Sequence, residues 1–174
     1  MGERVDIYTQ DRVNTGETRE REGLRLGEGE YMLYVLAVVE DAKGRVLITR
    51  RALDKHWAPG AWEVPGGGAG AGETSAQAVV REVREEVGLD VSGLDLTPAH
   101  SYRNDDLERG DNYIVDIYRF SLCFDASDVR LQHSEAIDAR LATWDEVAAL
   151  AVEGEFLHYE RLQQARASER WDAR

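Results

Sequence analysis

Residues 67–89 constrain the fold of this chain more than any other stretch, because a glycine-rich loop there runs directly into an amphipathic segment. Thr74 and Gln77 have the spacing of a helix capping box, and Gly88 fits the position just past a helix end. These signals predict a helix over about residues 74–87. Apolar residues recur at i, i+3, i+4 and i+7, so one helix face should pack on a sheet. They are Ala76, Val79, Val80, Val83 and Val87.

The rest of the chain alternates apolar runs with turn signals, which predicts strands interleaved with helices. Strands are expected over residues 3–9, 31–39, 45–49, 62–64, 96–102, 113–124, 129–131 and 140–142. Thr143 and Glu146 form a second capping box, which opens a helix that Gly154 should stop. A last helix is expected over residues 156–165. Interleaving without an internal repeat predicts the α/β class with a mixed sheet.

The length of the chain suits one domain with a short extension. Residues 1–30 are the expected extension, a strand or hairpin with a turn at residues 14–16 and then a charged, solvated connection. Residues 31–174 are the expected main domain. Strand edges exposed in the extension are compatible with a homodimer.

The net charge of −13 disfavours nucleic acid as a partner, because acidic residues spread over the chain repel a polyanion. The longest apolar run, residues 31–39, is far shorter than the roughly 20 residues of a membrane-spanning helix, and the N-terminus has no apolar targeting segment. We therefore expect a soluble cytoplasmic protein that binds neither nucleic acid nor membrane. The single cysteine, Cys123, lies among apolar residues and is expected to pack as a small hydrophobic side chain.

Three glutamates share a second flank of the predicted helix: Glu82, Glu85 and Glu86. Like charges three and four residues apart repel each other, so a positive group is expected among them. Carboxylate oxygens favour hard cations such as Mg²⁺ or Mn²⁺ over zinc, and Mg²⁺ commonly binds substrate phosphate as well. The alternative is a solvated acidic face balanced by Arg81 and Arg84. The spacing that begins in the glycine loop decides between the two.

That spacing resembles the complete signature of the Nudix hydrolases. It reads Gly67, five residues, Glu73, seven residues, Arg81-Glu82-Val83, one residue, Glu85-Glu86, one residue, and Gly88-Leu89. So many fixed positions make the match specific, and residues 50–51 and 59–67 extend it toward the N-terminus. The resemblance covers about residues 31–152 and implies a Nudix-type α/β/α sandwich with a mixed central sheet.

The resemblance also implies a set of metal ligands and catalytic residues. The implied ligands of Mg²⁺ or Mn²⁺ are the backbone carbonyl of Gly67 and the side chains of Glu82, Glu85 and Glu86. One of these glutamates, Glu82 or Glu85, is also a candidate catalytic base, and Arg81 is expected to orient Glu73. Gly70 stands where many members carry an acid, which leaves the number of cations open.

In some members of the family a later loop supplies the general base. Glu135 ranks first in this chain because it lies in the loop before the last predicted strand. The other candidates are Asp105, Asp106 and Glu108. Arg51 is the candidate phosphate contact, and the aromatic residues that could stack on a base are Trp57, Trp62 and Tyr102. Of the four histidines, His56 is the one expected near the site.

The implied reaction is metal-assisted attack of water on phosphorus in a small substrate whose diphosphate is linked to another group, often a nucleoside diphosphate derivative. Two alternatives stay open. Residues 3–8 and 52–57 resemble the Nudix branch that includes isopentenyl-diphosphate isomerase, although Cys123 lies in a late predicted strand and not next to the metal site. The other alternative is a sensor that binds a nucleotide without cleaving it, and the intact glutamates weigh against it.

Overall fold

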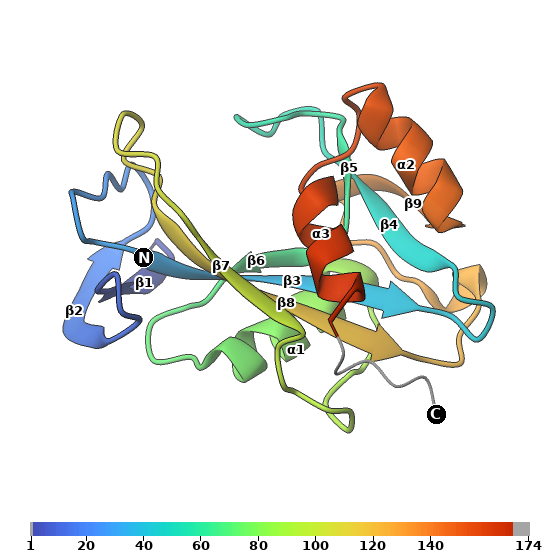
Figure 1. Ribbon diagram of the computed structural model, residues 1–174, viewed down its shortest axis with the longest axis horizontal. Helices are drawn as coiled ribbons and strands as arrows, with labels where there is room; N and C mark the ends of the chain where they lie inside the picture. The colour runs from blue at the N-terminus through green and yellow to red at the C-terminus, as the bar shows by residue number, and fades with distance from the viewer. Residues whose placement is uncertain (1, 169–174) are drawn as a thin grey trace.

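Strands and helices interleave along the chain, and the computed structural model describes residues 2–168 (Figure 1). The strands are β1 (Arg4–Tyr8), β2 (Asn14–Glu20), β3 (Met32–Glu40), β4 (Val46–Arg51), β5 (Trp62–Glu63), β6 (Gly66–Gly68), β7 (His100–Asn104), β8 (Tyr113–Ser121) and β9 (Ala136–Ala142). The helices are α1 (Ser75–Val87), α2 (Trp144–Val152) and α3 (Tyr159–Arg166), with a short 3₁₀ turn at Ala126–Asp128.

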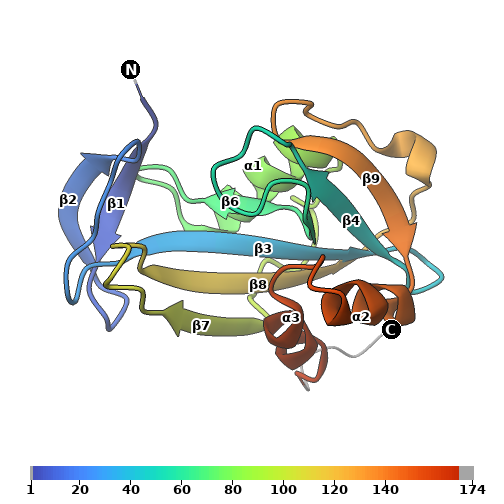
Figure 2. The same ribbon diagram turned by 90° about the horizontal axis from the view of Figure 1, so that it is seen from above.

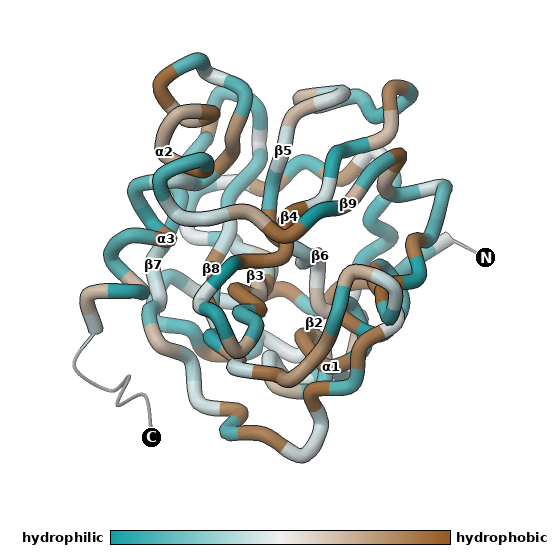
Figure 3. Tube along the Cα trace, turned by 90° about the vertical axis from the view of Figure 1, so that its right-hand side faces the viewer, coloured by the Kyte–Doolittle hydropathy of each residue, from teal (hydrophilic) through white to brown (hydrophobic). Residues whose placement is uncertain are grey.

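A parallel pair of strands, β3 and β8, forms the centre of the main sheet. Met32 lies opposite Tyr113 and Glu40 opposite Ser121, so the two strands pair over their whole length. Within residues 2–168 the strand order of the main sheet is β5-β4-β3-β8-β7, with β6 also paired to β3 and β9 to β4. Every pairing in this sheet other than β3–β8 is antiparallel. Apolar residues gather along β3 and β4 (Figure 3), and nearly all of β3 is buried. The predicted mixed central sheet is confirmed.

Helices cover both faces of this sheet (Figure 2). On one face, Val83 of α1 packs in a buried cluster with Val35 of β3. On the other face, Leu162 of α3 and Val147 of α2 pack with Leu36 of β3. Neighbouring residues of β3 thus serve opposite cores, as the alternation of a strand requires. The predicted α/β/α sandwich is confirmed.

The buried face of α1 differs from the predicted one. Ala78 and Glu82 are buried, whereas Ala76 and Val80 are only partly covered. The glycine strand β6 explains the difference, because Gly67 has no side chain and lets the Glu82 side of the helix come close. A pattern of apolar residues does not reveal this rotation.

Both predicted capping boxes are confirmed. Thr74 and Gln77 exchange side-chain-to-backbone hydrogen bonds at the start of α1, and Thr143 and Glu146 do the same at α2. Each pair satisfies backbone N–H groups that the first turn of a helix leaves without an intrahelical partner. The chain therefore sets the start of the site-bearing helix locally.

The last helix begins later than predicted. His158 has a φ of 62°, in the left-handed region, and α3 starts after it at Tyr159. Phe156, which was predicted to be helical, is buried and forms an isolated parallel bridge with Trp62. Its apolar side chain fills the core instead of lining a helix.

Several strand predictions in the second half of the chain are wrong. β7 begins at His100 and not at residue 96, and β9 begins at Ala136 and not at residue 140. β8 ends at Ser121 and not at residue 124, and Cys123 beyond it is exposed, so it does not pack as a core residue. Residues 129–131 form no strand. The Arg130 N–H instead donates to the carbonyl of Val87 at 2.9 Å, so this segment covers the end of α1.

β1 and β2 form a separate two-stranded hairpin at one end of the sheet (Figure 1). Its turn lies at residues 9–13 and not at residues 14–16. The charged segment is strand β2 as far as Glu20 and forms the predicted connection only over residues 21–30. Arg19 pairs there with Glu17 at 2.8 Å and with Glu30 at 2.6 Å. These ion pairs let charged residues occupy a strand that faces water.

Arg12, in the hairpin turn, ties the hairpin to the sheet through Asp116 of β8. The Asp116 carboxylate is fully buried and accepts hydrogen bonds from Arg12 Nη1 at 2.7 Å, from Ser101 Oγ at 2.6 Å and from Ser75 Oγ. Burial raises the pKa of Asp116, but these hydrogen bonds outweigh burial and hold the pKa below its ordinary value. The core therefore contains an ionised carboxylate whose counter-charge comes from the N-terminal hairpin.

Replacing Arg12 by methionine should lower the free energy of unfolding by about 2 kcal/mol at neutral pH, because Asp116 would keep a buried charge with only hydroxyl partners. The pKa of Asp116 is lower in the folded protein than in the unfolded chain, so the pair stabilises the protein above about pH 4. That contribution is lost as the pH falls through the folded-state pKa. Urea unfolding across this range should show the gap between the two proteins narrowing in acid.

Arg84→Met is the matched control, because it removes an exposed ion pair with Asp90. This control should change the free energy of unfolding by no more than about 0.5 kcal/mol. A gap between Arg12→Met and the unaltered protein that stays constant down to acid pH would contradict the role given to Asp116.

Candidate active site

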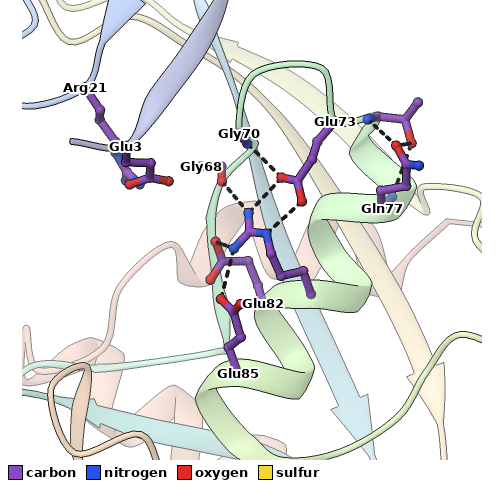
Figure 4. Close-up of polar contacts among 10 residues, drawn as sticks. Glu3, Arg21, Gly68, Gly70, Glu73, Gln77, Glu82 and Glu85 are labelled. Atoms are coloured by element: carbon purple, nitrogen blue, oxygen red, sulfur yellow. Dashed lines mark hydrogen bonds and ion pairs between the residues drawn. The ribbon is translucent and has the colours of Figure 1, made fainter. Parts of the chain in front are cut away.

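One guanidinium group organises the loop and the helix of the site (Figure 4). Arg81 Nε and Nη2 donate to the two oxygens of Glu73 at 2.7 and 2.8 Å, which confirms the predicted Arg81–Glu73 contact. Arg81 Nη1 donates to Glu82 at 2.8 Å and to Glu85 at 3.2 Å, and Nη2 also donates to the carbonyl of Gly68 at 3.0 Å. Arg81 therefore links the glycine strand to three of the four signature glutamates.

The backbone of β6 comes unusually close to the carboxylate of Glu82. A Cβ at Gly67 would lie 2.3 Å from Glu82 Oε1, so no residue with a side chain fits there without displacing the glutamate. The preceding loop is held to the same helix, because Glu73, which accepts a hydrogen bond from the Gly70 N–H at 2.7 Å, is itself bound by Arg81 of α1. The predicted ligands Gly67 and Glu82 are thus brought together.

Glu86 adds a second enclosed carboxylate beside Glu82. It accepts a hydrogen bond from the Gly66 N–H at 3.1 Å. Burial, followed by the charges of Glu82 and Glu63, raises the pKa of Glu86 well above its ordinary value. Burial also raises the pKa of Glu82 and of Glu63, although Arg81 and Arg51 respectively oppose the effect. This corner of the site therefore has more negative charge than its cations balance.

The arrangement fits a hard divalent cation. Among residues 2–168 no three acidic, histidine or cysteine side chains already converge into a metal-binding group. Arg81 holds Glu82 and Glu85, and the Gly66 N–H holds Glu86, which accounts for their separation. The donor set is nonetheless made of oxygen atoms only, as Mg²⁺ and Mn²⁺ prefer, and the carboxylates are crowded and short of positive charge.

These residues line a cavity of about 270 Å³ that opens beside a second cavity of about 390 Å³. The first cavity is lined by Glu3, Arg21, Tyr34, Arg51, Lys55, Gly66, Gly67, Arg81, Glu82, Glu85, Glu86, Gln132 and Glu135. The second is lined by Arg21, Tyr34, Arg51, Trp57, Tyr102, Asn104, Asp106, Arg109, Asp111, Tyr113, Val115 and His158. Arg21, Tyr34 and Arg51 belong to both, so they lie where the two cavities meet.

The structure brings most of the predicted loop residues to these cavities. Glu135 lines the first cavity and is ion-paired with Lys55. Arg51 lies over the ring of Trp57 at 5.3 Å and pairs with Glu63 at 2.8 Å. Trp57 thus stands at the second cavity, held by a cation over its ring.

Other predicted residues lie elsewhere. Trp62 is buried in the core and lines neither cavity. Asp105 accepts a hydrogen bond from the Tyr31 hydroxyl, and neither Asp105 nor Glu108 lines either cavity. His56 is likewise absent from both linings, whereas His158 takes part in the second. Asp106 lines the second cavity and not the first, so it does not stand among the signature glutamates.

Sequence reasoning missed Arg21, Tyr34, Lys55 and His158. Arg21 lies in a charged segment that was interpreted as a solvated connection, and no local pattern marks it. His158 packs against Trp57 with 5.9 Å between ring centroids, and burial, followed by the charge of Arg51, lowers its pKa. Tyr34 lies among core residues along β3, so its own stretch of sequence does not mark it as a cavity residue. Its position at the cavity depends on how the neighbouring strands are arranged.

The site combines a carboxylate-rich loop and helix with a cavity that cationic residues line. This arrangement is suited to phosphate chemistry and defines the class of protein. The chain belongs to the Nudix family, since the NUDIX domain model matches residues 30–164. An uncharacterised Nudix hydrolase of Listeria monocytogenes is 35% identical over 163 residues, which are 93% of this chain and 92% of that protein. The 8-oxo-dGTP diphosphatase of Proteus vulgaris is 42% identical over 67 residues, 37% of this chain and 59% of that protein.

Comparison of structures shows the same fold in another protein. A crystal structure of a Deinococcus radiodurans protein superposes with a TM-score of 0.73 at 22% identity, covering 97% of this chain and 100% of that one. The protein is accordingly a Nudix hydrolase, an enzyme that acts on diphosphate-containing substrates. Among residues 2–168, no helix has the length and apolar character needed to cross a membrane.

Glu86→Gln should stabilise the protein in the presence of a chelator, because it removes a crowded negative charge and keeps an oxygen for the Gly66 N–H. A gain of about 1 kcal/mol would raise the melting temperature by roughly 2–4 °C, which differential scanning calorimetry measures. Glu85→Gln is the control: its side chain is 53% exposed, so its melting temperature should stay close to that of the unaltered protein. A Glu86→Gln variant that melts below Glu85→Gln would refute the proposed crowding.

Proposed function

We propose that this enzyme is a Mg²⁺- or Mn²⁺-dependent pyrophosphohydrolase that cleaves nucleoside diphosphates linked to another group. The observation that carries the proposal is the close approach of the Gly67 backbone to Glu82, with Glu85 and Glu86 on the same cavity. Crowded carboxylates of this kind need a positive partner, and a diphosphate needs one as well. A divalent cation bound between the carboxylates and the diphosphate would balance the negative charge of both.

The proposed ligands of the cation are the carbonyl of Gly67 and the carboxylates of Glu82, Glu85 and Glu86. When bound, the cation would neutralise phosphate charge and lower the pKa of a water molecule that attacks phosphorus. Arg81 holds the carboxylates of Glu82 and Glu85 in position through its hydrogen bonds.

Proton transfer is assigned to a carboxylate on the first cavity. Glu135 is the first candidate to take the proton from the attacking water, because it lines this cavity and Lys55 fixes its position by an ion pair. Glu82 and Glu85 are the second candidates, since they also face the cavity but are held by Arg81.

The second cavity favours a nucleoside as part of the substrate. Trp57 and Tyr102 offer aromatic rings for a base. Asn104, Asp106 and Asp111 offer oxygen acceptors for hydroxyl groups, which an isoprenoid chain would leave unmatched. A polar lining with aromatic faces is therefore better suited to a base and a sugar than to a hydrocarbon.

The isomerase alternative is weaker because Cys123 is exposed beyond β8 and lines neither cavity. The sensor alternative predicts binding without turnover, and the complete set of signature residues around Arg81 weighs against it. A cytoplasmic location and a homodimer stay predictions from the sequence.

Metal-dependent release of phosphate or pyrophosphate should be measurable on at least one member of a substrate panel. The panel comprises nucleotide sugars, ADP-ribose, dinucleoside polyphosphates, modified dNTPs and isoprenoid diphosphates. Turnover should be abolished by a chelator and fall at least about 100-fold in the double variant Glu85→Gln, Glu86→Gln, because the cation loses two ligands. The double variant Glu153→Gln, Glu155→Gln, at exposed positions after α2, is the matched control. Full activity of the ligand double variant, or of the chelated enzyme, would eliminate the proposal.

Arg21→Gln should raise KM about tenfold with a smaller change in kcat, because Arg21 stands where the cavities meet and would bind a substrate phosphate. Steady-state kinetics on the best substrate of the panel measures this split. Arg19→Gln is the control, since Arg19 carries hairpin ion pairs but lines neither cavity. Glu3→Gln removes the 2.8 Å ion-pair partner of Arg21 and should not raise KM. An equal rise of KM in Arg21→Gln and Glu3→Gln would show that the Arg21–Glu3 ion pair, and not a contact of Arg21 with the substrate, determines KM.

A further inference from the structure

The metal-binding loop is rich in glycine, so its shape has to be fixed by other parts of the molecule. Residues 66–72 contain five glycines, and each glycine loses more conformational freedom on ordering than any other residue, by about 0.5–1 kcal/mol relative to alanine. Two contacts within the signature oppose this loss: Arg81 Nη2 binds the Gly68 carbonyl, and the Gly70 N–H binds Glu73. The first contact comes from α1 and the second from Glu73, which Arg81 of α1 binds, while residues 66–68 pair with β3.

Strand β1 of the N-terminal hairpin fixes residues 71–72 of the loop. The Ala71 N–H donates to the carbonyl of Arg4 at 2.8 Å, and the Gly72 N–H donates to Asp6 Oδ2 at 2.9 Å. Asp6 is itself held in the hairpin, because Thr18 Oγ1 donates to its other oxygen at 2.9 Å. Two successive N–H groups of the loop are therefore bound by a strand that precedes the matched NUDIX segment.

The same hairpin also fixes the start of α1. Arg12 and Ser75 both donate to the buried carboxylate of Asp116, and the Tyr118 hydroxyl donates to Ser75 Oγ at 2.8 Å. Ser75 is the first residue of the helix that carries the signature glutamates. The loop is thus anchored to the hairpin at residues 71–72, and the helix that follows is anchored to it through Asp116.

We propose that the N-terminal hairpin is a clamp for the metal-binding loop and that Asp6 is a positioning residue that sets the affinity for the divalent cation. The inference rests on the proposed function, since it takes the Gly67 carbonyl and the glutamates as the cation site. Asp6 does not bind the cation. It holds the Gly72 N–H, and through this contact it restricts the glycine-rich backbone that presents the Gly67 carbonyl.

Three variants separate this role from general stability. Asp6→Ala removes the acceptor of the Gly72 N–H, and Asp6→Asn keeps an oxygen for it. Thr18→Val removes one of the two hairpin hydrogen bonds to Asp6, the other coming from Asn14 Nδ2 at 3.1 Å, and leaves the contact with the loop in place. Mn²⁺ affinity is measured by calorimetry without substrate, and hydrogen exchange of the Ala71 and Gly72 amides is measured with a chelator present.

Asp6→Ala should weaken Mn²⁺ binding about tenfold, the scale on which outer residues tune metal sites, and should speed exchange of the Gly72 amide. Asp6→Asn should restore most of the Mn²⁺ affinity and most of the protection of the Gly72 amide. Thr18→Val should have the Mn²⁺ affinity and the Gly72 exchange rate of the unaltered protein even if its melting temperature falls. Unchanged Mn²⁺ affinity in Asp6→Ala, or equal weakening in Thr18→Val, overturns the clamp. If the unaltered protein binds no Mn²⁺, the proposed function fails, and unchanged exchange of Gly72 in Asp6→Ala then overturns the clamp separately.

Discussion

The approach of the Gly67 backbone to the Glu82 carboxylate is the contact on which the site depends. It requires a glycine at that position, since a Cβ would overlap the carboxylate. It also draws the Glu82 side of α1 into the interior, where an acid is costly unless it is paired. Arg81 supplies that pairing, and the valines of the same helix hold it on the sheet. Two contacts therefore determine the position of the helix. Burial of its valines stabilises the fold, whereas burial of the Glu82 carboxylate is unfavourable without its partner.

The cations of the first cavity differ in how fully they are paired. Arg81 is bonded to three glutamates and a carbonyl, and Arg51 is paired with Glu63 and packed on Trp57. Arg21 makes one side-chain hydrogen bond among the described residues, to the half-exposed Glu3. The well-paired arginines shape the site, while Arg21 keeps donors for an incoming anion. Such a division fits an enzyme whose net charge of −13 would otherwise repel its substrate.

The sequence predicted what depends on neighbours along the chain. Both capping boxes, the length of α1 and the buried runs of β3 and β4 follow from local spacing, and so do the signature residues around Arg81. Contacts between distant segments escaped prediction. Apolar periodicity did not show that Glu82 is buried, because the reason lies in the missing side chain of Gly67.

The misplaced elements have similar causes. Phe156 was assigned to a helix because it is apolar, but the left-handed backbone of His158 delays α3 and leaves Phe156 in the core. Cys123 was expected to be buried from its apolar neighbours, yet β8 ends two residues earlier. β2 was missed because its residues are charged, and Arg19 and Glu17 of the strand pair with each other.

The bond between Arg12 and Asp116 also bears on how the molecule assembles. The two residues are 104 positions apart, and the β3–β8 pairing has a similarly long reach along the chain. During synthesis the hairpin leaves the ribosome before β8, so its arginine meets the carboxylate only after β8 has emerged. Contacts of such long range slow folding, since the intervening chain must close a large loop before they form. The glycine loop and its glutamates thus acquire their final arrangement late, after two-thirds of the chain is available.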